Sequence, residues 1–199
     1  MTNIRAGDEF PFSMFCGFAE KTLVRDKKHK QIMPAVDDFY IDSKGRTRWL
    51  ANDSLGELLK QLYAFLVIGN YEESHAARYP RLAHAISRYP ESVLQLKEEE
   101  RLQEISGVSE IISGIIRELI ETGTCRKMEV GDEFFTPPPK TVLELVAIPR
   151  LGAKTAKKLY QEYGIDSLAA LRAAACDGSL EKVDGIGKAM VAAVLEFEE

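Results

Sequence analysis

Apolar residues recur at a helical period in the stretch that follows residue 51. Asn52, Asp53 and Ser54 are residue types that commonly cap a helix start, and an apolar face runs from there to Gly69. The members of this face are Leu55, Leu58, Leu59, Leu62, Phe65 and Leu66. Their spacing of three and four residues predicts one amphipathic helix over this stretch.

Shorter helical patterns fill the rest of the chain. We expect a helix over about 79–89, in which Pro80 fits only the first turn. After it we expect helices over about 91–96, 99–104 and 110–121, the last one stopped by Gly123. Beyond a Pro-rich stretch at 134–139, the expected helices cover about 141–147, 153–163, 167–174, 178–182 and 188–197, with breaks at Gly152, Gly164, Gly178 and Gly187. The pattern predicts an all-α chain.

The first 52 residues have a different pattern. Phe39-Tyr40-Ile41 is strand-like, Asp42-Ser43-Lys44-Gly45 is typical of a turn, and Arg46-Thr47-Arg48-Trp49-Leu50 can return, which predicts a β-hairpin. Upstream lie aromatic residues between 10 and 18 and a basic run over 25–30. The aromatics either cover the helical core or contact a protein partner, and the basic run is either a DNA-contacting arm or a solvated loop.

These changes in sequence pattern divide the chain into four parts. We expect an N-terminal extension over 1–52, a helical domain over 53–129, a Pro-rich linker over 130–140 and a second helical domain over 141–199. The chain of 199 residues is long enough for a real core, with 45% hydrophobic and 29% charged residues.

Cysteine use, histidine spacing and hydropathy bear on location and cofactors. Three scattered cysteines indicate a reducing interior, and no apolar run suggests a signal peptide or a membrane helix, so we expect a cytoplasmic protein, associated with the nucleoid in a bacterium. The three histidines are scattered too, so we expect neither a resident metal nor a cofactor. The net charge of −5 opposes DNA binding unless basic residues cluster locally.

One short turn pattern occurs three times, each time before an expected helix. The copies are Ile105-Ser106-Gly107-Val108-Ser109, Ile148-Pro149-Arg150-Leu151-Gly152 and Val183-Asp184-Gly185-Ile186-Gly187. Glycine permits the turn and a close approach, and the unpaired amides of the helix that follows point at an anion. A single such turn is often an ordinary loop, but the repetition indicates helix-hairpin-helix elements that hold a nucleic-acid phosphate.

The three hairpins differ in quality. The third has an intact turn, the second has Arg150 in place of the first glycine together with a basic cluster, and in the first Ser109 and Glu110 oppose phosphate binding. The expected DNA-binding residues are Arg150, Gly152, Lys154, Thr155, Lys157, Lys158, Gly185, Gly187 and Lys188, with weaker candidates at Gly107, Ser109 and Tyr79. Lys157 and Lys158 also fit an ordinary solvated helix face.

Residues 53–199, about three quarters of the chain, resemble the N-terminal part of family X DNA polymerases, the group of DNA polymerase beta. Arg78-Tyr79-Pro80-Arg81-Leu82-Ala83-His84-Ala85-Ile86 is similar to a helix of their small DNA-binding domain, and residues 102–123 are similar to its first hairpin. Residues 143–168 and 178–197 resemble the fingers subdomain, in the same order. The resemblance implies a helix-hairpin-helix fold that binds double-stranded or gapped DNA in DNA repair or maintenance.

The chain departs from the family at the residues that carry its catalysis. The chain lacks the Gly-Ser nucleotide motif and the Asp-x-Asp pair of the family's palm, so we expect no polymerase chemistry. The lysine that some relatives use as a Schiff-base nucleophile falls on Ile115, and a second family lysine falls on His75. Lys60, Lys97 or Lys127 would have to substitute for it.

The resemblance also implies a monovalent cation, Na or K, that bridges a hairpin to a DNA phosphate. Here it would be held by the carbonyls of Val146, Ile148 and Leu151, and the alternative is that no ion binds without DNA. Three functions remain: a non-catalytic, sequence-independent DNA-binding protein; a protein-interaction module, with residues 1–52 contacting a partner; and an abasic-site lyase that removes 5′-deoxyribose phosphate.

Overall fold

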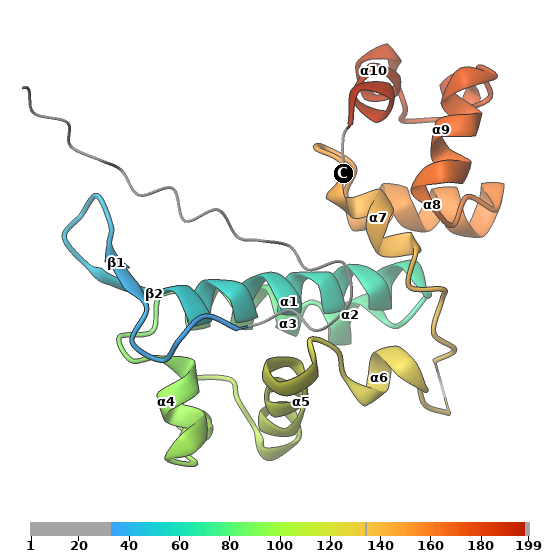
Figure 1. Cartoon of the computed structure of the whole chain (residues 1–199). Helices are drawn as coiled ribbons and strands as arrows, with labels where there is room; N and C mark the ends of the chain where they lie inside the picture. Colours follow the sequence, from blue (N-terminus) through green and yellow to red (C-terminus); the bar gives the residue numbers. More distant parts are fainter. Residues whose placement is uncertain (1–32, 134, 198–199) are drawn as a thin grey trace, which may run out of the picture.

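The helices are stacked in three tiers (Figure 1). The structure is a computed structural model that describes residues 33–133 and 135–197. The middle tier contains α1 (Leu50–Ile68), α2 (Glu73–Ala76) and α3 (Arg78–Ile86). The lower tier contains α4 (Val93–Glu98), the 3-10 helix η1 (Leu102–Glu104), α5 (Glu110–Thr122) and α6 (Arg126–Glu129). The upper tier contains α7 (Val142–Ala147), α8 (Ala153–Tyr163), α9 (Leu168–Cys176), the 3-10 helix η2 (Leu180–Lys182) and α10 (Lys188–Glu196).

The all-α prediction and the predicted β-hairpin are both confirmed. Strands β1 (Phe39–Ile41) and β2 (Thr47–Trp49) pair antiparallel, with Phe39 opposite Trp49. Two expected α-helices, 99–104 and 178–182, contain 3-10 helices instead, and α2 and α6 were not predicted. The expected aromatic cluster at 10–18 and the basic run at 25–30 lie outside the described residues. None of the helices described within 33–133 and 135–197 is long and apolar enough to cross a membrane.

Helix α1 is the centre of the core. Its buried side chains occupy more than the single face expected, because Ala64, Val67 and Ile68 are buried along with the predicted positions. A helix that is apolar on most sides is covered by neighbours on most sides. Consistently, α1 contacts α3 in its own tier, α4, α5 and α6 below it, and α7 and α8 above it.

The polar residues expected to cap α1 have another role. The helix begins at Leu50 without a side-chain cap, and Asn52 is 1% exposed. Its amide Nδ2 donates to the carbonyls of Ile86 (3.1 Å) and Glu91 (2.9 Å), and its Oδ1 accepts from the Val93 amide (2.7 Å). The capping prediction is therefore wrong: Asn52 ties α1 to the end of α3 and the start of α4.

The Pro-rich stretch packs against the end of α1. Phe135 is 4% exposed, and its ring lies edge-on to Phe65 (6.3 Å between centroids) and Tyr71 (5.5 Å). A Cβ on Gly69 would lie 2.5 Å from the Phe135 ring and 2.7 Å from Pro138. Glycine is therefore required at the end of α1 to let this stretch pass, while the four-part division of the chain stays a prediction.

Replacing Asn52 with alanine should strongly destabilise the protein. The substitution leaves the Val93 amide and the Glu91 carbonyl without a partner among the described residues, while the Ile86 carbonyl keeps the Tyr89 amide. Each unpaired group costs about 1–3 kcal/mol, so the free energy of unfolding should fall by about 2 kcal/mol or more. Urea unfolding followed by circular dichroism measures this. Asn70→Gly, at an exposed position with φ 66°, is the control and should change that free energy by no more than about 1 kcal/mol. A loss in Asn52→Ala no larger than the control would contradict the role of Asn52.

Asp42 should make stability depend on pH at the acid end. The pKa of its carboxyl group is lowered, first by a hydrogen bond from the Arg46 amide. Further hydrogen bonds from the Lys44 amide and from the Arg46 and Arg48 side chains add to this effect. A carboxyl whose pKa is lowered by folding stabilises the fold above its unfolded pKa of about 3.9, and this stability is lost as the pH falls through the folded pKa. Asp42→Asn should therefore be less stable than the parent at pH 7, with a difference that shrinks below about pH 4.

Chemical unfolding at a series of pH values tests this expectation. Asp37→Asn, at an exposed position in the loop before β1, is the matched control and should show no such pH-dependent difference. A difference between Asp42→Asn and the parent that is the same at pH 7 and at pH 2.5 would contradict it.

Candidate nucleic-acid interface

The three repeated turns have one backbone conformation. In each, the amide of the fourth residue donates to the carbonyl of the first: Val108 to Ile105 (3.0 Å), Leu151 to Ile148 (3.1 Å) and Ile186 to Val183 (3.0 Å). The third residue of each turn has a positive φ, with values of 88° at Gly107, 70° at Arg150 and 90° at Gly185. These are β-turns whose third residue favours glycine. Their apolar first and fourth residues are buried, which confirms that the three hairpins are structural copies.

The hairpins differ at the residue that precedes the second helix. Ser109, Gly152 and Gly187 are the N-cap residues of α5, α8 and α10, and all have extended backbone angles. The Ser109 hydroxyl accepts a hydrogen bond from the Ile112 amide, whereas α8 and α10 have no side-chain cap. Amides in the first turn of α8 and α10 are therefore available to an external anion, while α5 caps itself.

The fold does not require glycine at positions 152 and 187. Their φ values are −83° and −99°, which any residue adopts, and a Cβ at either position would meet no atom of the described residues within 4 Å. Gly185 differs because its φ of 90° strongly favours glycine. The two N-cap glycines keep the approach to the helix amides open, as a phosphate needs.

The structure divides the predicted cations into two groups. Lys154 forms an ion pair with Glu73 of α2 (2.8 Å), which raises the pKa of its amine, and Lys158 donates to the Asp184 carbonyl (3.0 Å). Among the described residues, Arg150, Lys157 and Lys188 make no ion pair or hydrogen bond through their side chains. Thr155 is half-buried in the first turn of α8.

The Lys158 contact joins two hairpins. Its amine also lies 3.3 Å from the Asp184 carboxylate, which belongs to the third turn. The second and third hairpins are therefore held beside each other. Lys158 serves this contact and is not a freely solvated charge.

The weaker candidates belong to the first hairpin and its surroundings. Tyr79 is 4% exposed, and burial raises the pKa of its hydroxyl. A Cβ on Gly107 would lie 3.3 Å from Leu82, so this turn packs closely on α3. Tyr79 therefore lies in the core, and the first hairpin presents a capped helix start followed by Glu110.

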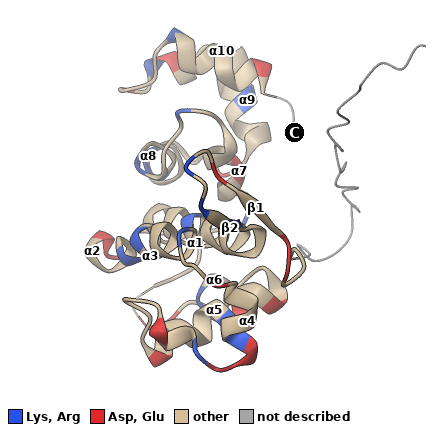
Figure 2. Cartoon of the chain, turned by 90° about the vertical axis from the view of Figure 1, so that its left-hand side faces the viewer, with Lys and Arg blue, Asp and Glu red and all other residues tan. Residues whose placement is uncertain are grey.

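Charge is unevenly distributed between the tiers. Residues 91–133 include eleven acidic and five basic residues, whereas 142–197 have seven of each. Figure 2 shows acidic residues on the lower tier and basic residues on α8 and around α3. The net negative charge is thus concentrated around the first hairpin and away from the other two.

A basic surface on α3 was missed by the sequence analysis as a binding site. Arg78, Arg81, His84 and Arg88 are exposed along and just after this helix. The available signal was the absence of any acidic residue between 74 and 90. Because Lys154 of α8 reaches Glu73 just before α3, this surface begins close to the second hairpin.

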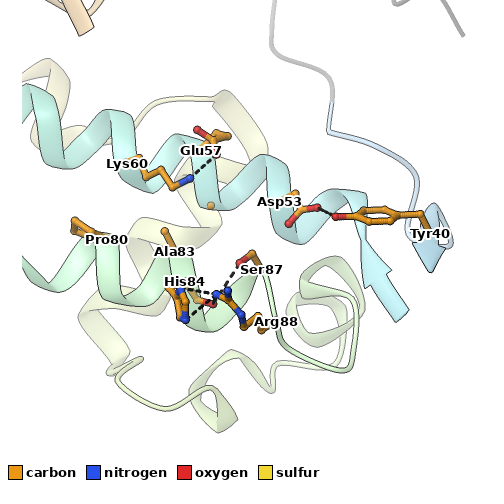
Figure 3. Close-up of a pocket in the computed structure, with 10 residues that line it drawn as sticks. Tyr40, Asp53, Glu57, Lys60, Pro80, Ala83, His84, Ser87 and Arg88 are labelled. Atoms are coloured by element: carbon orange, nitrogen blue, oxygen red, sulfur yellow. Dashed lines mark hydrogen bonds and ion pairs between the residues drawn. The ribbon is translucent and has the colours of Figure 1, made fainter. Parts of the chain in front are cut away.

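A shallow cavity of about 530 Å³ lies between α1 and α3 (Figure 3). Its polar side chains bind one another: Tyr40 donates to Asp53 (3.0 Å), Lys60 to Glu57 (2.6 Å), and Arg88 contacts the His84 ring (2.7 Å). These polar groups already have partners within the cavity, so it does not form the candidate site.

Metal-binding groups are also few in the part of the chain that the structure describes. Within 33–133 and 135–197, no three His, Cys, Asp or Glu side chains come together in a way that would hold a metal ion. The carbonyls expected to hold a monovalent cation, those of Val146, Ile148 and Leu151, lie in and just before the second turn. The Ile148 carbonyl already accepts the Leu151 amide in that turn.

Comparison with known proteins agrees with the geometry of the upper tier. Residues 142–197 match a family model described as a SAM-like helix-hairpin-helix tandem. The matched segment begins at α7 and includes the second and third hairpins. No curated protein matches the chain. The match does not single out family X DNA polymerases, so that resemblance stays a prediction.

Arg150, which has a positive φ in the second turn, should make that turn less stable than one with glycine at the same position. Arg150→Gly should raise the free energy of unfolding by about 0.5–1 kcal/mol, because relief of left-handed strain exceeds the added entropy of the unfolded chain. Gly185→Ala, at the matching position of the third turn, should lower it by about 1–2 kcal/mol. Denaturant unfolding of the two variants checks both signs. If both substitutions changed the free energy of unfolding in the same direction, the two turns would not be equivalent.

Proposed function

We propose that this protein is a non-catalytic, sequence-independent DNA-binding protein. In this proposal the second and third hairpins hold phosphates of a duplex backbone, at or near a gap or an end, in DNA repair or maintenance. The observation that carries the proposal is the pair of N-cap glycines, Gly152 and Gly187, which the fold itself does not require. Both lie before helix amides without a side-chain cap, in the segment that matches the helix-hairpin-helix tandem.

Backbone amides explain why the binding would be independent of sequence. Contacts to phosphate position a protein on DNA but carry no information about the bases. Among the predicted DNA-binding residues, Arg150, Lys157 and Lys188 are the cations whose side chains make no ion pair or hydrogen bond within the described residues. Retaining arginine at a positive φ is a backbone cost, and such a cost is typical of functional sites.

The charge distribution sets the expected strength of binding. The tandem has equal numbers of acidic and basic residues, so few phosphates are neutralised and affinity should be modest and salt-sensitive. The exposed basic residues along and just after α3, which include Arg78, Arg81 and Arg88, offer a second contact for the same duplex. A Na or K ion at the second turn would bridge hairpin and phosphate, as the resemblance to family X polymerases implies.

The residues near the first hairpin support a protein without lyase activity. Ile115, at the position of the family's Schiff-base lysine, has no amine. Burial lowers the pKa of Lys127, but its contacts with the Tyr71 hydroxyl and the Asp132 carboxylate outweigh this effect and hold the pKa above its usual value. A protonated amine is a poor nucleophile, which argues against Lys127 as a substitute.

The alternative of a protein-interaction module is favoured by one specific observation. The first hairpin caps itself with Ser109 and lies in the acidic lower tier, so it repels DNA. This part of the molecule is better suited to a protein partner, and the two functions are compatible because they use different tiers. A contact made by residues 1–52 remains part of this alternative.

The proposal is tested by placing side chains at the two N-cap glycines, Gly152 and Gly187. The double substitution Gly152→Val with Gly187→Val places side chains over the helix amides at backbone angles that valine accepts. We expect duplex affinity to fall about tenfold or more, since contacts to two phosphates are blocked. Fluorescence anisotropy with a labelled gapped duplex, titrated at several salt concentrations, measures this, and unfolding experiments should show a stability loss of no more than about 2 kcal/mol.

Ser109→Val on the first hairpin is the matched control. It removes a genuine cap and should cost about 1 kcal/mol of stability, yet leave DNA affinity unchanged. The proposal fails if the parent protein does not bind DNA at low salt, or if the double variant binds as tightly as the parent. Borohydride trapping on an abasic duplex would reveal a covalent adduct if the chain were a lyase.

A further inference from the structure

The outward face of α5 is apolar where the equivalent face of α8 is basic. Counted from the N-cap residues Ser109 and Gly152, the positions of Lys154, Lys157 and Lys158 in α8 are occupied in α5 by Ile111, Gly114 and Ile115. The two helices follow turns of the same conformation, so the positions correspond in space as well as in sequence. One structural element therefore presents two opposite surfaces.

The part of the chain that the structure describes leaves this apolar face uncovered. Ile111 is 78% exposed, the largest exposed fraction among the large hydrophobic side chains of the described residues, and Ile115 is half-buried beside it. Gly114 lies between them, and a Cβ at this position would meet nothing within 4 Å in the described part of the chain. Glycine inside a helix is destabilising relative to alanine, and no contact within the described chain explains its presence.

Acidic side chains surround the apolar positions. Glu110, Glu118 and Glu121 lie on the exposed half of α5, with Arg117 the one basic residue of the helix. Glu118 accepts a hydrogen bond from the Arg126 amide, and Glu121 pairs with Lys97. The whole of 91–133 has eleven acidic and five basic residues, so a partner of this face meets a negative field.

We propose that the face formed by Ile111, Gly114 and Ile115 binds a basic amphipathic helix of a protein partner. An apolar side of that helix would lie on Ile111 and Ile115, with Gly114 allowing close approach, and its lysines and arginines would meet the surrounding glutamates. Nucleic acid and anionic lipid are repelled by the same acids. A second copy of this face would bring glutamates against glutamates, which disfavours a symmetric dimer.

The position of α5 separates this surface from the DNA interface. Helices α5 and α8 lie on opposite sides of the middle tier in both views of the molecule (Figures 1 and 2). A partner bound to α5 would therefore leave the second and third hairpins accessible to DNA. The inference does not depend on the proposed function, because it rests on the lower tier alone.

A labelled amphipathic peptide of about 18 leucine and lysine residues tests the proposal, with the full chain titrated and anisotropy recorded. Ile111→Glu should weaken peptide binding about tenfold or more, the effect expected for a central apolar contact. This substitution adds an acid, so attraction by charge alone would strengthen binding instead. Val130→Glu, at another exposed apolar position (69%) of the lower tier, should leave affinity within about twofold.

The remaining outcomes overturn the proposal. They are no peptide binding by the parent protein, no loss in Ile111→Glu, or equal losses in Ile111→Glu and Val130→Glu. Self-association in sedimentation experiments that Ile111→Glu abolishes would assign the face to a second copy. Weaker duplex binding by Ile111→Glu would assign the face to DNA. Unfolding curves for both variants confirm that the fold is retained.

Discussion

Burial of α1 is the constraint on which the rest of the structure depends. Its apolar side chains face in too many directions for one neighbour to cover, so helices of all three tiers pack around it. The Asn52 side chain fixes the lower part of this arrangement through the backbone of residues 86–93, and Phe135 fixes the upper part at Gly69. The third hairpin is held to the second by the contact between Lys158 and Asp184.

One helix-hairpin-helix geometry serves two kinds of surface. The turn conformation is the same in all three hairpins, and only the residues exposed on the second helix differ. In the proposed function, the glycine caps of the second and third hairpins admit a phosphate, whereas Ser109, Glu110 and Ile111 keep it from the first. Separation of charge between tiers explains how a chain with a net charge of −5 is compatible with DNA binding.

The sequence predicted the elements whose signals are local. The bounds of α8, residues 153–163, agree with the expectation because Gly152 and Gly164 mark both ends. Asn52 was misread because a capping asparagine and a buried one that binds distant backbone groups look alike in sequence. The pairs Lys154–Glu73 and Lys158–Asp184 join elements far apart in the chain, so no local pattern reveals which lysines are already engaged. The basic surface of α3 was visible as an acid-free stretch, although its exposure was not.

The central claim is that amides of the second and third hairpins hold DNA phosphates. Titration of isotope-labelled protein with a short gapped duplex, followed by amide chemical shifts, tests it most directly. The account predicts the largest shifts at the starts of α8 and α10, from Ala153 and Lys188 onward, with the start of α5 unchanged. The largest shifts at Glu110–Thr122, or no shifts at low salt, would contradict it.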